Sequence, residues 1–351
     1  MGRRRSDDPA ICGVLLVDKP AGPTSHDVVG WVRRGLKIRR VGHCGTLDPA
    51  ATGLLVVAVG AATKLVPYLT GQDKSYRARI VLGRSTTTAD AQGETVAETP
   101  CPEGLEAEVA AAVEALHGTQ QLAPPAYSAV HVDGKRAHEL ARAGESVELA
   151  TRPMTVHASE LHEVVRRGSE IEVSVTFAVS KGTYIRSLAE ALGQRLGVPA
   201  HLGALHRISS GDMALSHERA LGGLHATPLE PGPKGQPRWR IEGPADSQTP
   251  QTPPKPRLLA HLLSPADVVP LPLLRVGADE HGQRALRKLA SGQAVALADP
   301  GLPPWTGPDA KLAVAPAAPD RPGLMIVQVA NDGNGAQLRP ERIVVPPAGC
   351  S

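Results

Sequence analysis

Residues 42–53 read Gly-His-Cys-Gly-Thr-Leu-Asp-Pro-Ala-Ala-Thr-Gly and are followed at once by the apolar run Leu-Leu-Val-Val-Ala-Val at 54–59. Pro49 disfavours helical backbone at Asp48, and the glycines of the motif permit tight turns or close backbone approach. The stretch therefore predicts one carboxylate displayed on a loop at the end of a core strand, where catalytic groups are common. An Asp-Pro pair also begins ordinary turns, so the motif alone leaves both interpretations open.

The composition is that of a globular protein whose core is aliphatic. A chain of 351 residues suits one large domain and a small one. Hydrophobic residues make up 41% of it and aromatic residues 2%, so Leu, Val, Ile and Ala must fill the core. A formal net charge of +3 permits a polyanionic partner without requiring one. The four cysteines are scattered, which favours reduced thiols over a disulfide frame or a zinc site, and we expect no metal.

The N-terminal residues give no sign of export or membrane insertion. Residues 1–10 carry three consecutive arginines without an apolar run behind them, which does not fit a signal peptide and predicts a disordered polar arm. No stretch approaches the roughly 18 apolar residues that span a bilayer. We therefore expect a cytoplasmic protein that does not enter a membrane.

Hydrophobic periodicity predicts an α+β fold, with helices packed on a mixed sheet. The predicted strands cover 13–17, 54–59, 75–82 and 171–179, and the predicted helices cover 25–36 (capped by Thr24 or Ser25), 103–117 (stopped by Gly118) and 185–196.

Two basic features flank the predicted strands. Arg186 follows an expected helix cap at Thr183, where a cation opposes the helix dipole by some tenths of a kcal/mol up to about 1. A nearby anion such as Asp48 or a phosphate would offset this cost, and an exposed surface arginine is the alternative. Arg39 and Arg40, just before the motif, fit either a solvated helix end or contact with phosphate.

Three further segments differ from the core in composition. Residues 125–152 alternate loops with a short basic helix, which predicts a flap over a ligand. Residues 224–257 are rich in Pro, Gly, Gln and Thr and predict a largely disordered insertion with no assigned role. Residues 271–346 show short apolar runs separated by Gly and Pro, which predicts a small β-rich module.

Taken together, the motifs resemble the TruB family of tRNA pseudouridine synthases. The matching segments occur in the family's order and cover roughly residues 12–216: Lys-Pro-Ala-Gly-Pro-Thr-Ser at 19–25, the whole of 42–53, Ala-Thr-Lys at 62–64, Lys-Ser-Tyr-Arg at 74–77, Tyr-Ser-Ala at 127–129, Lys-Gly-Thr-Tyr-Ile-Arg at 181–186 and Ala-His-Leu at 200–202. The resemblance implies isomerisation of uridine to pseudouridine at position 55, in the T-loop of tRNA, without a cofactor.

The resemblance also implies residue roles. Asp48 is then the catalytic aspartate, acting as a nucleophile at C1′ or as a base on the sugar. Arg186 pairs with it and keeps it ionised, since an opposite charge lowers a carboxylate pKa. The flipped-out uridine is contacted by four further residues: His43 helps to displace it, Tyr76 packs against it and helps to remove the C5 proton, and Tyr184 and Leu205 line the pocket. Candidates for RNA-backbone contact are Lys64, Arg39, Arg40 and Arg142.

The implied domain organisation is a catalytic domain at 11–270, including the flap and the insertion, and a C-terminal PUA-like module at 271–351. The partner is the tRNA elbow, and we expect a monomer without an obligate protein partner. A tRNA-folding chaperone is compatible with the same residues, although a pure binding protein does not need Asp48, Tyr76 and Arg186 together. A phosphoaspartate hydrolase lacks its second acidic residue and its phosphate loop.

Overall fold

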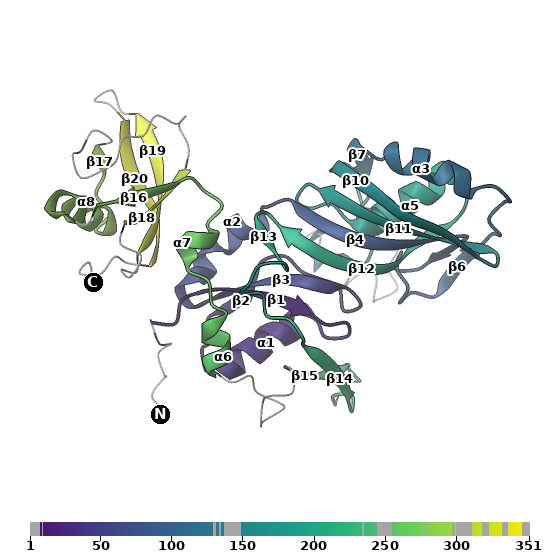
Figure 1. Cartoon of the computed structure of the whole chain (residues 1–351), viewed down its shortest axis with the longest axis horizontal. Coiled ribbons are helices and arrows are strands. Elements are labelled where there is room, and N and C mark those ends of the chain that lie inside the picture. Colours follow the sequence, from purple (N-terminus) through teal and green to yellow (C-terminus); the bar gives the residue numbers. More distant parts are fainter. Residues whose placement is uncertain are drawn as a thin grey trace.

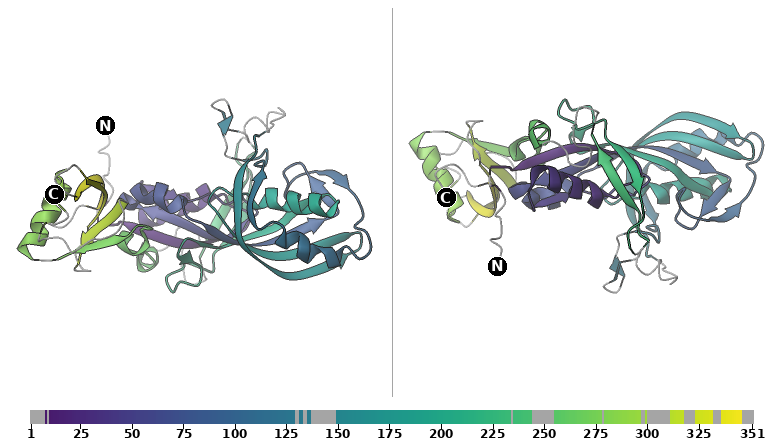
Figure 2. Two further views of the ribbon diagram at one scale, coloured as in Figure 1. Left: turned by 90° about the horizontal axis from the view of Figure 1, so that it is seen from above. Right: turned by 90° about the horizontal axis from the view of Figure 1, so that it is seen from below.

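The protein is described here by a computed structural model covering residues 8, 10–128, 131–132, 135–136, 149–233, 235–243, 255–277, 279–296, 299, 311–317, 323–331 and 336–345. It is elongated, with a large twisted sheet in the centre and at one end and a small C-terminal module at the other (Figure 1, Figure 2). The arm predicted at 1–10 and most of the predicted flap lie outside the described residues.

The central sheet is mixed, as the sequence predicts. Its strands run in the order β1-β3-β12-β4-β11-β10-β7, with β2 paired to β3 and β13 to β12. The pairing of β3 with β12 is parallel and the others are antiparallel. The bounds are β1 (Gly13–Lys19), β2 (Val41–His43), β3 (Thr52–Val59), β4 (Lys74–Leu82), β7 (Gly118–Leu122), β10 (Arg152–Arg167), β11 (Glu170–Val179), β12 (Ala200–Ser210) and β13 (Met213–Ala214).

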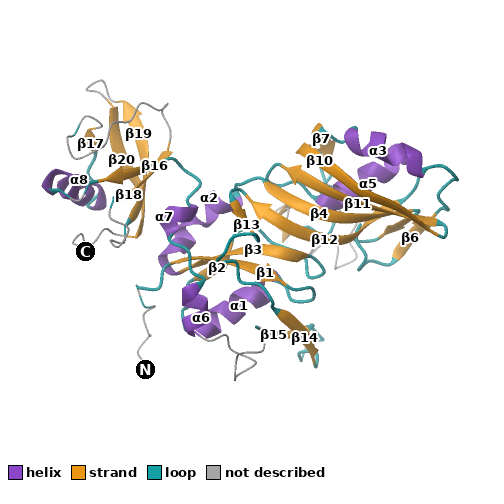
Figure 3. Ribbon diagram, viewed as in Figure 1, coloured by secondary structure: helices purple, strands orange, loops and turns teal. Residues whose placement is uncertain are grey.

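Helices α1, α3 and α5 share one apolar core with the sheet (Figure 3). Their bounds are α1 (Ser25–Leu36), α3 (Glu106–Glu114) and α5 (Ile185–Leu196), while η1 (Gly60–Leu65) and α2 (Val66–Thr70) join β3 to β4. The core combines Val28 of α1, Val109 of α3 and Leu188 of α5 with alternate residues of the strands, such as Val57 and Ile80. Burial on one face of each amphipathic helix is therefore what holds the helices on the sheet.

Local sequence signals set two of the helix boundaries. Thr24 caps α1 in a capping box with Asp27, as predicted: the Asp27 amide donates to the Thr24 hydroxyl at 3.1 Å, and the Thr24 amide donates to the Asp27 carboxylate at 2.8 Å. The cap predicted at Thr183 is wrong by one residue. Tyr184 occupies the cap of α5 without a side-chain hydrogen bond, because the Thr183 hydroxyl pairs with Ser180 at 3.1 Å.

Helix α3 is shorter than the predicted 103–117. It ends at Glu114, and Gly118, at φ +82°, begins β7 instead of stopping the helix. Two small hairpins complete this part of the chain: β5 (Arg84–Thr86) with β6 (Thr95–Glu98), and β8 (His131–Val132) with β9 (Lys135–Arg136).

The expectation of disorder over 224–257 is wrong for its described part. Residues His225–Leu229 (β14) and Arg238–Glu242 (β15) form an antiparallel hairpin beside α1 (Figure 1). Ile241 of this hairpin is 3% exposed and belongs to the main core. The Pro-rich composition concealed a two-residue apolar anchor, Trp239 and Ile241, at the period-2 spacing of a strand.

The C-terminal module is a five-stranded sheet with the order β16-β18-β19-β20-β17 and one helix. Its elements are β16 (Leu273–Val276), α8 (Glu280–Ala290), β17 (Val295–Ala296), β18 (Lys311–Pro316), β19 (Leu324–Asn331) and β20 (Ala336–Val345), reached through α6 (Lys255–Ala260) and α7 (Pro265–Val268).

The module packs, together with η1, α2 and α7, on the face of β1 and β3 opposite α1. Its residues Ala315 and Ile326 share a core with Leu16 and Val56. Lys64 adds a polar contact, because its ammonium donates to the Ile343 carbonyl at 2.6 Å. The strands β1 and β3 are thereby buried on both faces, which agrees with their continuous apolar sequences.

Candidate active site

The loop between β2 and β3 carries Asp48 and is held by buried cations from distant strands. Arg207 of β12, 1% exposed, donates to the carbonyl oxygens of Leu54 at 2.7 Å, Gly45 at 3.1 Å and Thr46 at 3.4 Å. These bonds satisfy carbonyls that a buried loop would otherwise leave without a partner. They fix the first half of the loop to the sheet.

Lys19, at the end of β1, fixes the second half of the loop. Its ammonium is fully buried and donates to the carbonyl oxygens of Ala51 at 2.8 Å, Pro20 at 2.9 Å and Pro49 at 3.1 Å. Burial lowers the pKa of Lys19 to about 8, against the opposing charge of Asp48. Pro49 itself and Ala51, two residues further on, are thus anchored from β1.

The glycines of the motif have the geometry that the sequence predicts at two positions. Gly45 and Gly53 lie at φ +99° and +98°. A Cβ on Gly53 would meet the backbone oxygen and nitrogen of Arg207 at 2.3 and 2.6 Å. Gly53 therefore allows β3 to approach β12 closely where their parallel pairing begins.

Asp48 pairs with Arg186, as the sequence predicts. The Arg186 Nη2 lies 3.1 Å from the Asp48 carboxylate, and Nη1 lies 3.7 Å from the carboxylate of Asp90. The side chain of Arg186 is 6% exposed, whereas that of Asp48 remains 41% exposed. The alternative interpretation of Arg186 as an exposed surface residue is therefore wrong. The two carboxylates offset the cost of a cation in the first turn of α5.

Arg186 also joins two segments that are far apart in the sequence. Its guanidinium donates to the carbonyl oxygens of Thr88 at 3.1 Å and Tyr127 at 2.9 Å. The planar fork therefore reaches four acceptors at once, which a lysine cannot do. This arrangement fixes the direction from which the cation meets Asp48.

The electrostatics of Asp48 differ in part from the expectation. Burial raises the pKa of the Asp48 carboxyl from its ordinary value, and this effect exceeds the lowering by Arg186. Asp90 adds to the rise and Lys19 opposes it. Arg186 acts in the predicted direction, but the expectation of a lowered pKa is wrong, because it took no account of burial and of a second carboxylate.

Strand register brings two of the predicted pocket residues next to the Asp48 loop. Gly53 pairs with Arg207, and Arg207 pairs with Tyr76 of β4. Leu205 pairs with Ala78 and therefore projects from the same face of the sheet as Tyr76. Tyr76 is 8% exposed and Leu205 is half-buried against the main core.

Two aromatic residues stand on other elements around the loop. Tyr184 caps α5 two residues before Arg186, and the guanidinium carbon of Arg152 lies 4.9 Å from the centre of its ring. His43 ends β2 opposite Val57. Burial lowers the pKa of His43, and its Nδ1 is buried without a hydrogen-bond partner among the described residues.

The predicted RNA-backbone residues that the structure describes lie on segments other than the Asp48 loop. Arg39 and Arg40 are exposed between α1 and β2. Lys64 lies on η1 and bonds to the C-terminal module through Ile343. Arg142 lies outside the described residues.

Sequence reasoning missed three residues of this arrangement. Asp90 lies in a segment interpreted only as a turn, and its distance of dozens of residues from Asp48 gives no local signal. Lys19 and Arg207 look like ordinary surface cations in the sequence. Only the folded structure shows that both side chains end at the Asp48 loop.

The described residues show no other obvious type of site. Within them, no group of three His, Cys, Asp or Glu side chains is placed to hold a metal ion. Likewise, none of their helices is both long and apolar enough to cross a bilayer.

The architecture is that of a pseudouridine synthase. The chain superposes on one in a solved Cbf5-Nop10-Gar1 complex with a TM-score of 0.62, covering 95% of this chain and 85% of that one at 23% identity. The archaeal box H/ACA sRNP Nop10-Cbf5 complex gives 0.60 at 22% identity. These likenesses confirm the α+β fold and the PUA-like C-terminal module.

Residues 33–185 match the model of the TruB family pseudouridylate synthase N-terminal domain. The chain is 47% identical over 213 residues to a tRNA pseudouridine synthase B of Arthrobacter sp. (strain FB24), covering 60% of this chain and 70% of that one. It is 43% identical over 244 residues to the enzyme of that name in Bacillus subtilis (strain 168), covering 66% and 79%. The chain belongs to the TruB family of pseudouridylate synthases, which are isomerases.

Proposed function

We propose that this protein isomerises uridine to pseudouridine at position 55, in the T-loop of tRNA, with Asp48 as its catalytic residue. The observation that carries the proposal is the pairing of a 41% exposed Asp48 with a buried Arg186. The names of the relatives support tRNA as the substrate. No redox change occurs, so the proposed reaction needs no cofactor.

The reaction breaks the C1′–N1 bond of uridine, turns the base and joins C1′ to C5, after which the C5 proton leaves. Asp48 acts either as a nucleophile at C1′ or as a base that removes a sugar proton. Both routes require an ionised carboxylate. Arg186 supports that form through its charge and directs the carboxylate, so that its open side is left for the ribose.

A uridine in a folded T-loop must leave its stack before Asp48 reaches C1′. We assign the walls of the base pocket to Tyr76, Tyr184 and Leu205. The shared sheet face of Tyr76 and Leu205, and the position of Tyr184 two residues before Arg186, support this assignment. Tyr76 then helps to remove the C5 proton. His43, at the end of β2, helps to displace and hold the nucleotide.

The tRNA elbow is the proposed partner, gripped by Arg39, Arg40 and Arg142 and by the segment 125–152. Lys64 is the remaining candidate for phosphate contact. The C-terminal module adds RNA surface in this proposal, and the enzyme acts as a monomer. Its place is the cytoplasm, because its tRNA substrate is there.

The test compares wild type with Asp48→Asn on unmodified tRNA transcript, together with Asp212→Asn, an exposed aspartate between β12 and β13, as the matched control. Wild type and Asp212→Asn are expected to form pseudouridine at position 55 and Asp48→Asn none. Binding of tRNA should stay within about twofold, because asparagine has nearly the same shape as aspartate. A transcript with cytidine at position 55 should not be modified.

Turnover by Asp48→Asn would refute the assignment of the catalytic residue. Modification at another uridine would refute the T-loop assignment. Binding without isomerisation by wild type would leave the tRNA-folding chaperone as the function that the site supports.

A further inference from the structure

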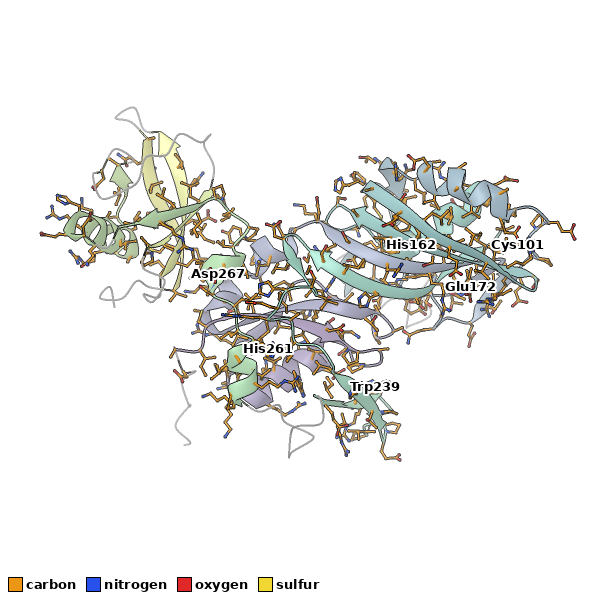
Figure 4. All side chains as sticks on the ribbon, viewed as in Figure 1. Cys101, His162, Glu172, Trp239, His261 and Asp267 are labelled. Carbon is orange, nitrogen blue, oxygen red and sulfur yellow. The ribbon has the colours of Figure 1, made fainter. Side chains whose placement is uncertain are left out.

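The hairpin β14–β15 lies against the turn that leads from β1 to α1. No function was predicted for this segment from the sequence. Figure 1 shows it beside α1, and Figure 4 marks Trp239 on it. Residues just before the hairpin tie it to β1: the Leu221 amide donates to the Leu16 carbonyl at 2.7 Å, and the Asp18 amide donates to the Leu221 carbonyl at 3.0 Å. The hairpin is therefore fixed at its base and by the buried Ile241.

Trp239 rests its ring on the backbone of Gly22. A Cβ built on Gly22 would lie 2.6, 2.7 and 2.8 Å from three atoms of the six-membered ring, distances that real Cβ atoms do not adopt. Gly22 also lies at φ +106°, where a side chain is strained. The indole thus contacts the main chain directly and limits the positions that this turn is able to take.

Gly22 in turn holds the residue after the catalytic aspartate. Its amide donates to the Pro49 carbonyl at 2.8 Å. The same carbonyl accepts from the Lys19 ammonium at 3.1 Å. A continuous line of contacts therefore runs from Trp239 through Gly22 and Pro49 to Asp48.

We propose that Trp239 is a positioning residue, which presses the Gly22 turn against Pro49 and so fixes the Asp48 carboxylate relative to Arg186. This role rests on the proposed function of Asp48. Arg186 holds the carboxylate from α5, while the hairpin holds its backbone from the opposite end of the loop. A displacement of about 1 Å at a reacting group is enough to cost about 100-fold in rate, so a contact two residues removed from the chemistry matters.

The experiment compares Trp239→Ala, Trp239→Phe and Arg238→Ala, the last being the neighbouring exposed residue of β15. Single-turnover rates on tRNA are expected to fall about 10- to 100-fold for Trp239→Ala. KM for tRNA should stay within about twofold, because the contact acts on the chemical step. Trp239→Phe, which keeps a ring over Gly22, should recover most of the rate, and Arg238→Ala should match wild type.

Hydrogen exchange at the Gly22 amide gives a second measurement that does not depend on turnover. In Trp239→Ala this amide is expected to exchange about tenfold faster or more, because the bond to Pro49 opens locally. The amides of β1, such as Leu16, should keep their wild-type rates. This pattern separates a loosened loop from general loss of folding.

A rate unchanged by Trp239→Ala, or an unchanged Gly22 exchange rate, overturns the proposal. A higher KM with an unchanged single-turnover rate also overturns it and assigns the hairpin to RNA binding. Faster exchange throughout the sheet, not restored by Trp239→Phe, reduces Trp239 to a residue of general stability. If wild type forms no pseudouridine, the proposed function fails, and the Gly22 exchange alone decides whether the hairpin holds the loop.

Discussion

Replacing Arg186 by methionine removes the cation that faces Asp48 while keeping an unbranched side chain of similar length. Four groups lose their contact with the guanidinium: the carboxylates of Asp48 and Asp90 and the carbonyl oxygens of Thr88 and Tyr127. The position is 5% exposed, so water does not replace the guanidinium freely. The change therefore tests whether this buried cation directs the catalytic carboxylate.

The expected loss follows from the contacts that are broken. The ion pair with Asp48, at 3.1 Å and partly open to solvent, lies between a surface pair and a buried one, so its loss is expected to cost about 1.5–3 kcal/mol. This corresponds to roughly 10- to 150-fold in rate, at about 1.4 kcal/mol for each factor of ten. The lost carbonyl contacts also release the segments at Thr88 and Tyr127. We therefore expect kcat to fall by about 100- to 1,000-fold.

The assay follows release of tritium from tRNA labelled at C5 of uridine, since the isomerisation expels that hydrogen. It is run across pH. Asp48 must be ionised, burial already raises its pKa, and the charge of Arg186 is the largest effect that lowers it. Removing that charge raises the pKa further, so the acid limb of the kcat profile should move to higher pH.

Arg195→Met is the matched control, because Arg195 lies on the same helix and its guanidinium donates to the exposed Gln120 side chain at 3.0 Å. It should behave like wild type. A loss of less than about tenfold in Arg186→Met, with an unmoved acid limb, would refute the reasoning that this cation controls the ionisation and direction of Asp48.

Three stability predictions follow from the same architecture. Lys19→Met removes a donor from three carbonyl oxygens, of which that of Pro49 keeps its bond from the Gly22 amide, and should lower the free energy of unfolding by about 2–3 kcal/mol. The pKa of Lys19 is about 8 in the folded protein and 10.5 ordinarily, so between these pH values the unfolded chain binds more protons than the folded one. The free energy of unfolding of wild type, measured in urea, should therefore rise relative to that of Lys19→Met from about pH 8 to 10.5. Gly53→Ala forces a Cβ into the Arg207 backbone and should cost about 3 kcal/mol or more, seen as a lower Tm; an unchanged Tm would contradict the close approach of β3 and β12. Phe177→Ala removes a fully buried ring and should cost about 3–5 kcal/mol in urea unfolding, whereas less than about 1 kcal/mol would show that the core at β11 is loosely packed.

The elements with strong local signals were predictable from the sequence. The capping box of Thr24 and the stripe of α1, the alternation of β4 and β11 and the apolar run of β3 each determine their own element. The strands β10 and β12 were not predicted, because their polar and apolar residues are set by neighbouring strands and by bulges rather than by a clean alternation. The hairpin β14–β15 was not predicted either, because only one tryptophan and one isoleucine anchor it and the rest of the segment is rich in Pro.

The candidate site shows the same division. Motif chemistry singled out Asp48, and a helix position that disfavours cations singled out Arg186. Tyr76 was proposed from the resemblance alone. Asp90 was not found, since its pairing with Arg186 at 3.7 Å exists only after β4, α5 and the loop after β5 meet. Buried lysine and arginine cannot be told from surface ones by sequence, because burial is a property of the register.

The buried cations explain how Asp48 is kept in one place although its carboxylate stays partly open to solvent. Lys19 and Arg207 donate to carbonyl oxygens of the loop, and the Asp48 carboxylate pairs with Arg186 instead. If either cation paired with the carboxylate directly, the loop would lose its anchors and Asp48 its accessible side. We therefore expect Lys19→Met to lower the free energy of unfolding with little change in the acid limb of the kcat profile. We expect Arg186→Met to move the acid limb with a smaller loss of stability. Measuring both quantities for both variants tests it, and an equal shift of the acid limb in the two variants would contradict it.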